Sequence, residues 1–263
     1  MITFRELVTS FRQLGLNSKF PIIAHTSLSA FERIQGGADT MVGAILAVSS
    51  GVLMPTFTYK TMLTPAEGPP NNGITYGSDG DHNQMAEFFH PEMPADALMG
   101  GVPEALRQHP QAKRSLHPIY SFAGINVDEA IQAQTLDDPF APIRVLTDSQ
   151  GMVLLLGVDQ SANTSIHYAE QRAGRKQFIR WALTPNGVVE CPAWPGCSGG
   201  FESIAPALEP YTRKTLLGNA TIQLIPLNML IRTVERLITA NPLALLCEYD
   251  DCERCQAIRT ANI

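Results

Sequence analysis

The chain has 263 residues, of which 44% are hydrophobic and 17% charged, and its formal net charge is −6. This composition supports a buried core and excludes an intrinsically disordered chain. The acidic balance argues against nucleic acid as a partner, because phosphate binding needs clustered Lys and Arg. The first residues are too polar for a secretion signal, and no apolar run is long enough to span a bilayer. We therefore expect a cytoplasmic protein without membrane association.

The first part of the chain predicts alternating helices and strands. In chain order we expect a helix at 1–18, a strand at 20–24, a helix at 41–48 and a strand at 51–57. A strand, helix and second strand in this order indicate a βαβ unit with parallel pairing. Residues 60–96 follow, rich in Pro, Gly, Asn and Asp. Loops of this length are uncommon in compact domains and often serve as lids or binding loops.

The second part continues the alternation and ends in a cysteine-containing tail, residues 247–263. We expect strands at 121–125 and 151–158, and helices at 103–108, 127–134, 165–172, 201–208 and 227–240. Two further strands, 177–183 and 188–191, flank a hairpin signal at Pro185-Asn186-Gly187. The predicted fold is one α/β domain over residues 1–263, with a mixed, largely parallel central sheet flanked by helices and an appended β-hairpin.

The strongest candidate for chemistry is His167 with Glu170. They lie three residues apart at the start of a predicted helix and therefore share one face of it. This helix follows the most apolar strand, and ligands of open α/β sheets gather at the carboxyl ends of strands. The helix N-terminus disfavours charged histidine and the carboxylate favours it, so a base poised near neutral pH is predicted. The alternative is an ordinary surface pair.

Two other polar segments are candidates for binding. His117 precedes a predicted strand and is expected to line the same cleft, unless it is a loop histidine bonded to the backbone. The segment His25-Thr26-Ser27 follows the first strand, and the turn Gly36-Gly37 opens the next helix. Backbone N–H groups in such a place bind phosphate or pantetheine, although a plain turn has the same sequence. Neither a dinucleotide fingerprint nor a Walker lysine is present.

The five cysteines argue against a disulfide framework, because their number is odd, and leave a metal site or free thiols as the alternatives. Four thiolates hold a structural zinc when they can converge. We expect Cys252 and Cys255, together with Cys197 and either Cys191 or Cys247, to form such a site. The other tail residues are strongly polar, which predicts docking through the cysteines and not through apolar burial. The alternative is a solvated tail with free thiols.

Several segments, in order from about residue 20 to about residue 205, resemble the aminoglycoside 3-N-acetyltransferase family. They are 25–28 (HTSL), 36–40 (GGADT), 53–58 (LMPTFT), 101–107 (GVPEALR), 114–118 (RSLHP), 121–124 (SFAG), 155–158 (LLGV), 163–170 (NTSIHYAE) and 196–202 (GCSGGFE). The resemblance implies an acetyl-CoA-dependent enzyme that transfers acetyl directly to an amine, a 2-deoxystreptamine aminoglycoside being the first candidate and antibiotic resistance the corresponding role.

The resemblance also implies roles for individual residues. His167 corresponds to the central histidine of the family, with Glu170 as its partner. The residues it places near the cofactor are His25, Thr26, Ser27, Gly36, Gly37, Thr56 and Thr58. The acceptor is expected at the 60–96 loop. Its charge, and not the resemblance, makes Asp79 and Asp81 candidates for binding a cationic substrate, together with His117 in the cleft.

Two other classes of protein remain open at this stage. One is a CoA-binding or zinc-stabilised protein of the same fold without catalysis. The other is a metal-dependent hydrolase using His25, His117 and His167, which the lack of an HExxH motif disfavours.

Overall fold

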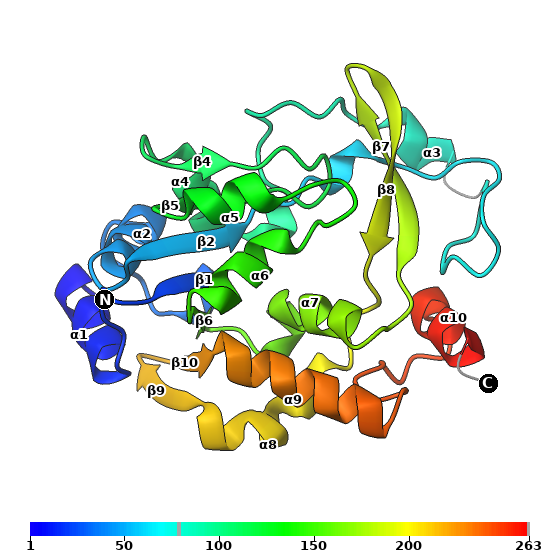
Figure 1. Cartoon of the computed structure of the whole chain (residues 1–263). Helices are drawn as coiled ribbons and strands as arrows, with labels where there is room; N and C mark the ends of the chain where they lie inside the picture. The colour runs from blue at the N-terminus through cyan, green and yellow to red at the C-terminus, as the bar shows by residue number, and fades with distance from the viewer. Residues whose placement is uncertain (78–79, 262–263) are drawn as a thin grey trace.

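The computed structural model describes residues 1–77 and 80–261, and a mixed sheet forms its centre (Figure 1). In spatial order the strands are β4 (Lys113–Arg114), β5 (Phe122–Ile125), β2 (Gly51–Pro55), β1 (Pro21–Thr26), β6 (Met152–Leu156), β10 (Ala220–Pro226) and β9 (Arg213–Leu217). β1 pairs in parallel with β2 and β6, and the outer pairings are antiparallel. The predicted mixed α/β sheet is confirmed, with its parallel pairing confined to the three central strands.

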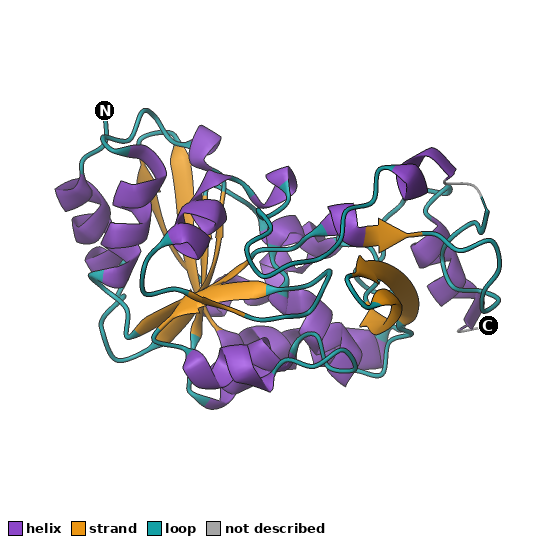
Figure 2. Ribbon diagram, turned by 90° about the horizontal axis from the view of Figure 1, so that it is seen from above, coloured by secondary structure: helices purple, strands orange, loops and turns teal. Residues whose placement is uncertain are grey.

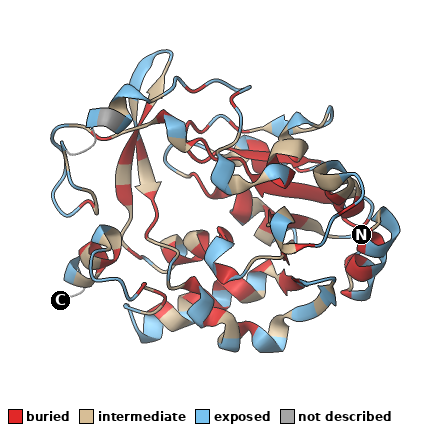
Figure 3. Cartoon of the chain, turned by 180° about the vertical axis from the view of Figure 1, so that it is seen from behind, coloured by how far each residue is buried: buried red, intermediate tan, exposed pale blue. Residues whose placement is uncertain are grey.

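The central strands are apolar on both faces because helices cover both faces (Figures 2 and 3). Ile22, Ala24 and Leu154 pack into one hydrophobic cluster, with α1 (Phe4–Gln13), α2 (Gly37–Leu46) and α4 (Gly101–Gln108). Ile23 and Val153 pack into the opposite cluster. Its helices are α5 (Asp128–Ala133), α6 (Ala141–Asp148), α7 (Ser165–Arg172) and α9 (Leu227–Ala240). Strand alternation thus divides one apolar run between two cores.

Because β1 pairs in parallel with both of its neighbours, the carboxyl ends of these three strands lie at the same edge of the sheet. The chain leaves β1 after Thr26, β2 after Pro55 and β6 after Leu156. Polar segments that lie far apart in sequence therefore meet at this edge, as in other open α/β sheets.

The predicted hairpin is present as β7 (Phe178–Thr184) and β8 (Gly187–Trp194). Gly187 has a φ of +109°, which explains the glycine at the turn. A third strand, β3 (Met62–Leu63), pairs with β7 and comes from the 60–96 segment. The sequence did not predict this third strand, because a two-residue strand has no readable periodicity.

The 60–96 segment is attached to the hairpin along its length. It contains β3 and α3 (Gly80–Gln84). The Asn72 side chain bonds to the backbone of Ile179 in both directions, at 2.8 and 3.1 Å, and the amide of Phe89 donates to Leu183 O at 2.9 Å. Asp79 lies outside the described residues, and so does the side chain of Asp81.

The tail forms a helix, α10 (Glu253–Ala261), that docks by apolar burial. Cys255, Ala257 and Ile258 are buried, and the last two belong to the same hydrophobic cluster as β6 and α9. The expectation that the tail is too polar for apolar docking is therefore wrong. Its polar residues occupy the exposed face of a short amphipathic helix. Within the described residues, no helix has both the length and the apolar content that crossing a lipid bilayer requires.

Docking of α10 predicts the effect of truncating Ile258. Ile258→Ala removes a fully buried side chain and is expected to lower the free energy of unfolding by about 2–5 kcal/mol. Leu216→Ala, on the exposed strand β9, is the matched control and should change it by less than about 0.5 kcal/mol. Urea denaturation followed by circular dichroism measures both. Equal stabilities would show that α10 does not dock in solution.

Candidate active site

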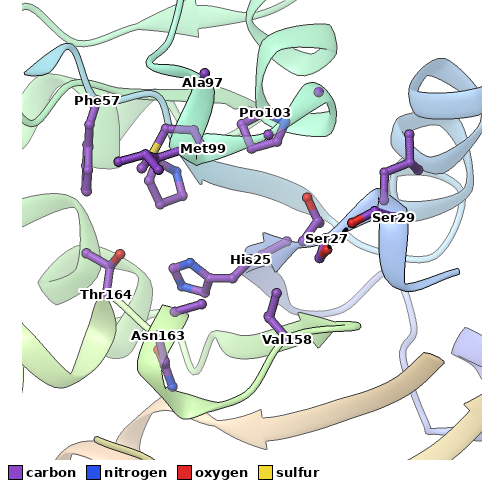
Figure 4. Close-up of a pocket in the computed structure, with 18 of the residues that line it drawn as sticks. His25, Ser27, Ser29, Phe57, Ala97, Met99, Pro103, Val158, Asn163 and Thr164 are labelled. Atoms are coloured by element: carbon purple, nitrogen blue, oxygen red, sulfur yellow. Dashed lines mark hydrogen bonds between the residues drawn. The ribbon is translucent and has the colours of Figure 1, made fainter. Parts of the chain in front are cut away.

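A pocket of about 1030 Å³ opens at the edge of the sheet where β1, β2 and β6 end (Figure 4). His25 reaches it from β1, Phe57 from the segment after β2, and Thr164 and His167 from the start of α7. Met99 covers it from the opposite side. Small-molecule sites commonly enclose roughly 300–1,000 Å³, so this volume suits a large ligand or two ligands together.

His167 and Glu170 form a hydrogen-bonded pair on α7. His167 Nδ1 lies 2.9 Å from Glu170 Oε2. His167 borders the pocket with 14% of its side chain exposed, whereas the Glu170 side chain is 1% exposed. The start of α7 is fixed by Asn163, whose Oδ1 accepts from the amide of Ser165 at 3.2 Å. The i,i+3 spacing places the two side chains together as the sequence predicted, and the pair is no ordinary surface pair, because Glu170 is buried and His167 is largely so.

Arg175 holds the other oxygen of the same carboxylate. Its Nη1 donates to Glu170 Oε1 at 2.7 Å, and both side chains are 1% exposed. Its Nη2 donates to Pro242 O at 2.9 Å and to Ala244 O at 2.7 Å. A buried carboxylate is stable only when it is paired, and Arg175 supplies the pairing. Arg175 was not predicted from the sequence, because its carbonyl partners lie about seventy positions away along the chain.

Two aromatic rings bound the imidazole of His167. The Phe201 ring lies 4.7 Å from it in an edge-on arrangement, and the Phe140 ring lies 6.2 Å away. Both phenylalanines are fully buried. They exclude water from the side of the imidazole that faces the core and restrict the orientation of its plane.

His25 brings a second imidazole to the pocket. Burial lowers the pKa of His25 to about 3, so the ring is neutral at pH 7. Among the described residues its Nε2 has no hydrogen-bond partner, nor does the hydroxyl of Thr26 beside it. Thr26 and Ser27 also line the pocket, and Ser27 Oγ lies 3.1 Å from Ser29 Oγ. This end of β1 therefore offers neutral hydrogen-bonding groups to a ligand.

The N-terminus of α2 borders the same pocket through Gly37. Gly36 is its N-cap, with a φ of +80° in the left-handed region, and provides no side-chain cap. First-turn amides of a helix lack intrahelical partners and attract anions, which fits the proposed contact with a phosphate or pantetheine. Gly36 itself does not line the pocket.

Three predicted site residues lie behind the pocket wall. The buried Thr56 hydroxyl donates to Ser121 O at 3.2 Å, and the buried Thr58 hydroxyl donates to Pro118 O at 2.6 Å. His117 Nδ1 accepts from the amides of Ile119 and Tyr120, and burial lowers the pKa of His117 to about 4. Phe57, between the two threonines, lines the pocket instead.

Four of the five cysteines converge at a second place, away from the pocket. The sulfur atoms of Cys197, Cys247, Cys252 and Cys255 all lie within 4.8 Å of one another. Between Cys191 and Cys247, which the sequence left open, the structure places Cys247 in the group. Cys191 is buried within β8, and burial raises its pKa to about 12.

The cluster favours a thiolate at Cys197. The thiol of Cys255 donates to Cys197 and lowers its pKa to about 4, with help from the amide of Gly199 at 3.2 Å. Cys247 Sγ and Cys255 Sγ are 3.4 Å apart. In a tetrahedron of Zn–S bonds of about 2.3 Å, neighbouring sulfur atoms are about 3.8 Å apart, so the arrangement is close to what zinc needs.

The sequence model of the aminoglycoside 3-N-acetyltransferase family matches residues 23–239, which is most of the chain. The chain belongs to this family. Aminoglycoside N(3)-acetyltransferase VII of Streptomyces paromomycinus is 33% identical over 192 residues, which cover 68% of this chain and 64% of that relative. The chain thus matches just under two thirds of the length of this curated relative.

Solved structures of aminoglycoside acetyltransferases share the fold. The apoenzyme of AAC(3)-IVa matches with a TM-score of 0.80 at 23% identity, covering 99% of this chain and 98% of that one. A mutant of the same enzyme has been solved in complex with a gentamicin, and it matches with a TM-score of 0.78. AAC-IIIb, solved as a binary complex with CoASH, matches with a TM-score of 0.72 at 22% identity, covering 90% of this chain and 96% of that one.

The buried pairing of Glu170 predicts a stability cost for its removal. Arg175→Ala leaves an unpaired buried carboxylate and is expected to lower the free energy of unfolding by about 3–5 kcal/mol. Arg172→Ala is the control, since Arg172 bonds to Glu235 at 2.7 Å with half its side chain exposed. Such surface pairs contribute about 0–1 kcal/mol. Similar losses for the two variants, measured by urea denaturation, would contradict the assigned role of Arg175.

Proposed function

We propose that this protein is an N-acetyltransferase that transfers the acetyl group of acetyl-CoA directly to an amine of a small molecule, with 2-deoxystreptamine aminoglycosides as the first candidate acceptors. The observation that carries the proposal is the His167–Glu170 pair at the wall of a 1030 Å³ pocket, in which the buried carboxylate of Glu170 is held by Arg175. Membership of the family supports the reaction class.

The pair has the arrangement of a general base and its orienting group. With Nδ1–H donating to Glu170, Nε2 of His167 carries a lone pair and can take a proton from the neutral amine as it attacks the thioester. The amine nitrogen then forms a bond to the thioester carbon, and the C–S bond breaks when the oxyanion collapses. The CoA thiolate leaves and accepts the proton from His167, so the base is regenerated without an acyl-enzyme.

The oxyanion needs a donor in the pocket. Thr58 does not serve, since its hydroxyl already donates to Pro118 O behind the wall. The hydroxyl of Thr164, at the start of α7, faces the same pocket as His25 and is the better candidate (Figure 4). Thr164 precedes His167 by three residues, so the donor and the base are presented by adjacent turns of one segment.

The two substrates are assigned to opposite ends of the pocket. We place CoA along Thr26, Ser27 and the N-terminus of α2 at Gly37, where hydroxyls and amides suit pantetheine and phosphate groups. A relative has been solved with CoASH, and another with a gentamicin. The net charge of −6 favours a cationic acceptor, with Asp79 and Asp81 as proposed contacts. A cytoplasmic location and a role in resistance are part of this proposal.

The proposed base predicts the phenotype of His167→Ala. Its turnover should fall roughly 10²- to 10⁴-fold, which is the usual contribution of a positioned base. The dissociation constant for CoA should stay close to that of the wild type, because the ring lies at the acetyl end of the ligand. A screen of amines with acetyl-CoA, detecting released thiol, measures turnover, and calorimetry measures binding.

His109→Ala is the control, since His109 lies at the end of α4 and does not line the pocket. Near-normal turnover of His167→Ala on an accepted amine would remove the base from the mechanism. Binding of CoA by the wild type without turnover on any amine would favour the non-catalytic alternative.

The same proposal includes a structural zinc at Cys197, Cys247, Cys252 and Cys255. Four thiolates form a closed tetrahedral site with no open position, so the ion would stabilise the fold without entering the reaction. The group joins the loop after β8 to α10, two segments that are more than fifty residues apart in sequence.

Protein purified without chelators is expected to contain about one zinc per chain by elemental analysis. Cys252→Ser should lose the metal and Cys191→Ala should keep it, because Cys191 lies outside the cluster. Metal-free protein with five freely titratable thiols and normal stability would rule the site out.

A further inference from the structure

The four-cysteine cluster lies at one end of each of two segments. Other residues of these segments contact His167 or the Arg175 that holds Glu170. One segment is the loop 196–201, which begins beside Cys197 and ends at Phe201. The other is the segment 241–247, which ends at Cys247. Cys252 and Cys255 come from the start of α10, so the cluster joins both segments to the C-terminal helix.

The first segment links the cluster to the imidazole. Ser198, next to Cys197, lines the pocket, and the ring of Phe201 lies 4.7 Å from the ring of His167. The loop between them is compressed against the second segment. A Cβ on Gly199 would lie 3.1 Å from Cys247 Cβ, and one on Gly200 would lie 2.4 Å from Leu246 O. The approach at Gly200 leaves no room for a side chain and the one at Gly199 is tight, so the two segments pack closely against each other.

The second segment links the cluster to the carboxylate. Pro242 O and Ala244 O accept from Nη2 of Arg175, and Nη1 of Arg175 holds Glu170. Leu245, between these carbonyls and Cys247, has a φ of +65°, a left-handed conformation that is costly for a leucine. Such a conformation persists only where its surroundings determine it. The attachment of Cys247, two residues later, is one such determinant.

We propose that a zinc ion bound by these four cysteines fixes both segments and thereby sets the geometry of the His167–Glu170 pair. The ion acts as a remote positioning element, and removing it misplaces the proposed base without removing any group that touches substrate. The inference rests on the proposed function for its effect on turnover. Its effect on the His167 ring does not depend on whether the protein acetylates anything.

The decisive experiment removes zinc from the intact protein with a high-affinity chelator and follows the imidazole of His167 by NMR. His167→Gln identifies the ring signals. The expected result is a changed His167 signal in a protein that stays folded by circular dichroism. Turnover should fall by up to about 100-fold, which is the effect of displacing a catalytic group by about 1 Å. Added zinc should restore both.

An unchanged His167 signal in folded, metal-free protein overturns the inference, whether or not an acceptor has been found. Failure to acetylate any amine, with the signal change intact, counts against the proposed function alone. Cys252→His keeps a zinc ligand and should retain the native signal, whereas Cys252→Ser should reproduce the chelated state. Cys191→Ala lies outside the cluster and should respond to chelation like the wild type.

If the metal-free protein unfolds, a zinc-loaded variant still tests one necessary step, the link from the 241–247 segment to the pair. Arg175→Gln leaves the four cysteines intact but weakens the link between the 241–247 segment and Glu170. It is expected to keep about one zinc per chain and to show a changed His167 signal and reduced turnover. A native His167 signal in this variant would overturn the inference, because the second segment would then have no effect on the position of the ring.

Discussion

The burial of one carboxylate, Glu170, constrains the whole candidate site. A charged group that is 1% exposed needs partners for both oxygens, and it has them in Arg175 and His167. Arg175 in turn needs acceptors for its remaining donors and takes two carbonyls from the segment after α9. One buried charge thus ties α7 to the C-terminal part of the chain. The pocket wall can be rigid because each of these side chains is held by the next.

The sequence predicted the parts of this site that depend on local spacing. An i,i+3 pair on a helix that follows the most apolar strand is visible without coordinates, and the structure places it at a pocket where β1, β2 and β6 end. The hairpin and the helix at 227–240 were equally local. The antiparallel pair β9–β10 was missed, because β9 is mostly exposed and the buried run of β10, which includes Gln223, shows no strict alternation of apolar and polar residues.

What the sequence did not predict depends on contacts between distant segments. Arg175 reads as an ordinary cation after a helix, and only the fold brings it to Glu170 on one side and to Ala244 on the other. The tail is polar on average, but the helical period gathers Cys255 and Ile258 on one buried face. Thr56, Phe57 and Thr58 follow one another after β2, and neighbouring side chains of such a segment point in opposite directions. Because Phe57 faces the pocket, the two threonines point away from it.

The position of Arg175 also defines what Glu170 contributes to the proposed catalysis. At an effective dielectric constant near 20, a carboxylate about 4 Å from an imidazolium stabilises it by about 4 kcal/mol. Here the guanidinium binds the opposite oxygen at 2.7 Å and offsets much of that field at the ring. In the proposed mechanism Glu170 therefore acts on His167 mainly through the geometry of one hydrogen bond, which fixes the tautomer of the ring. A base that depends on the orientation of its ring, and less on a neighbouring charge, is sensitive to small displacements of the segments that support it. The segments 196–201 and 241–247 are the supports that we propose for it.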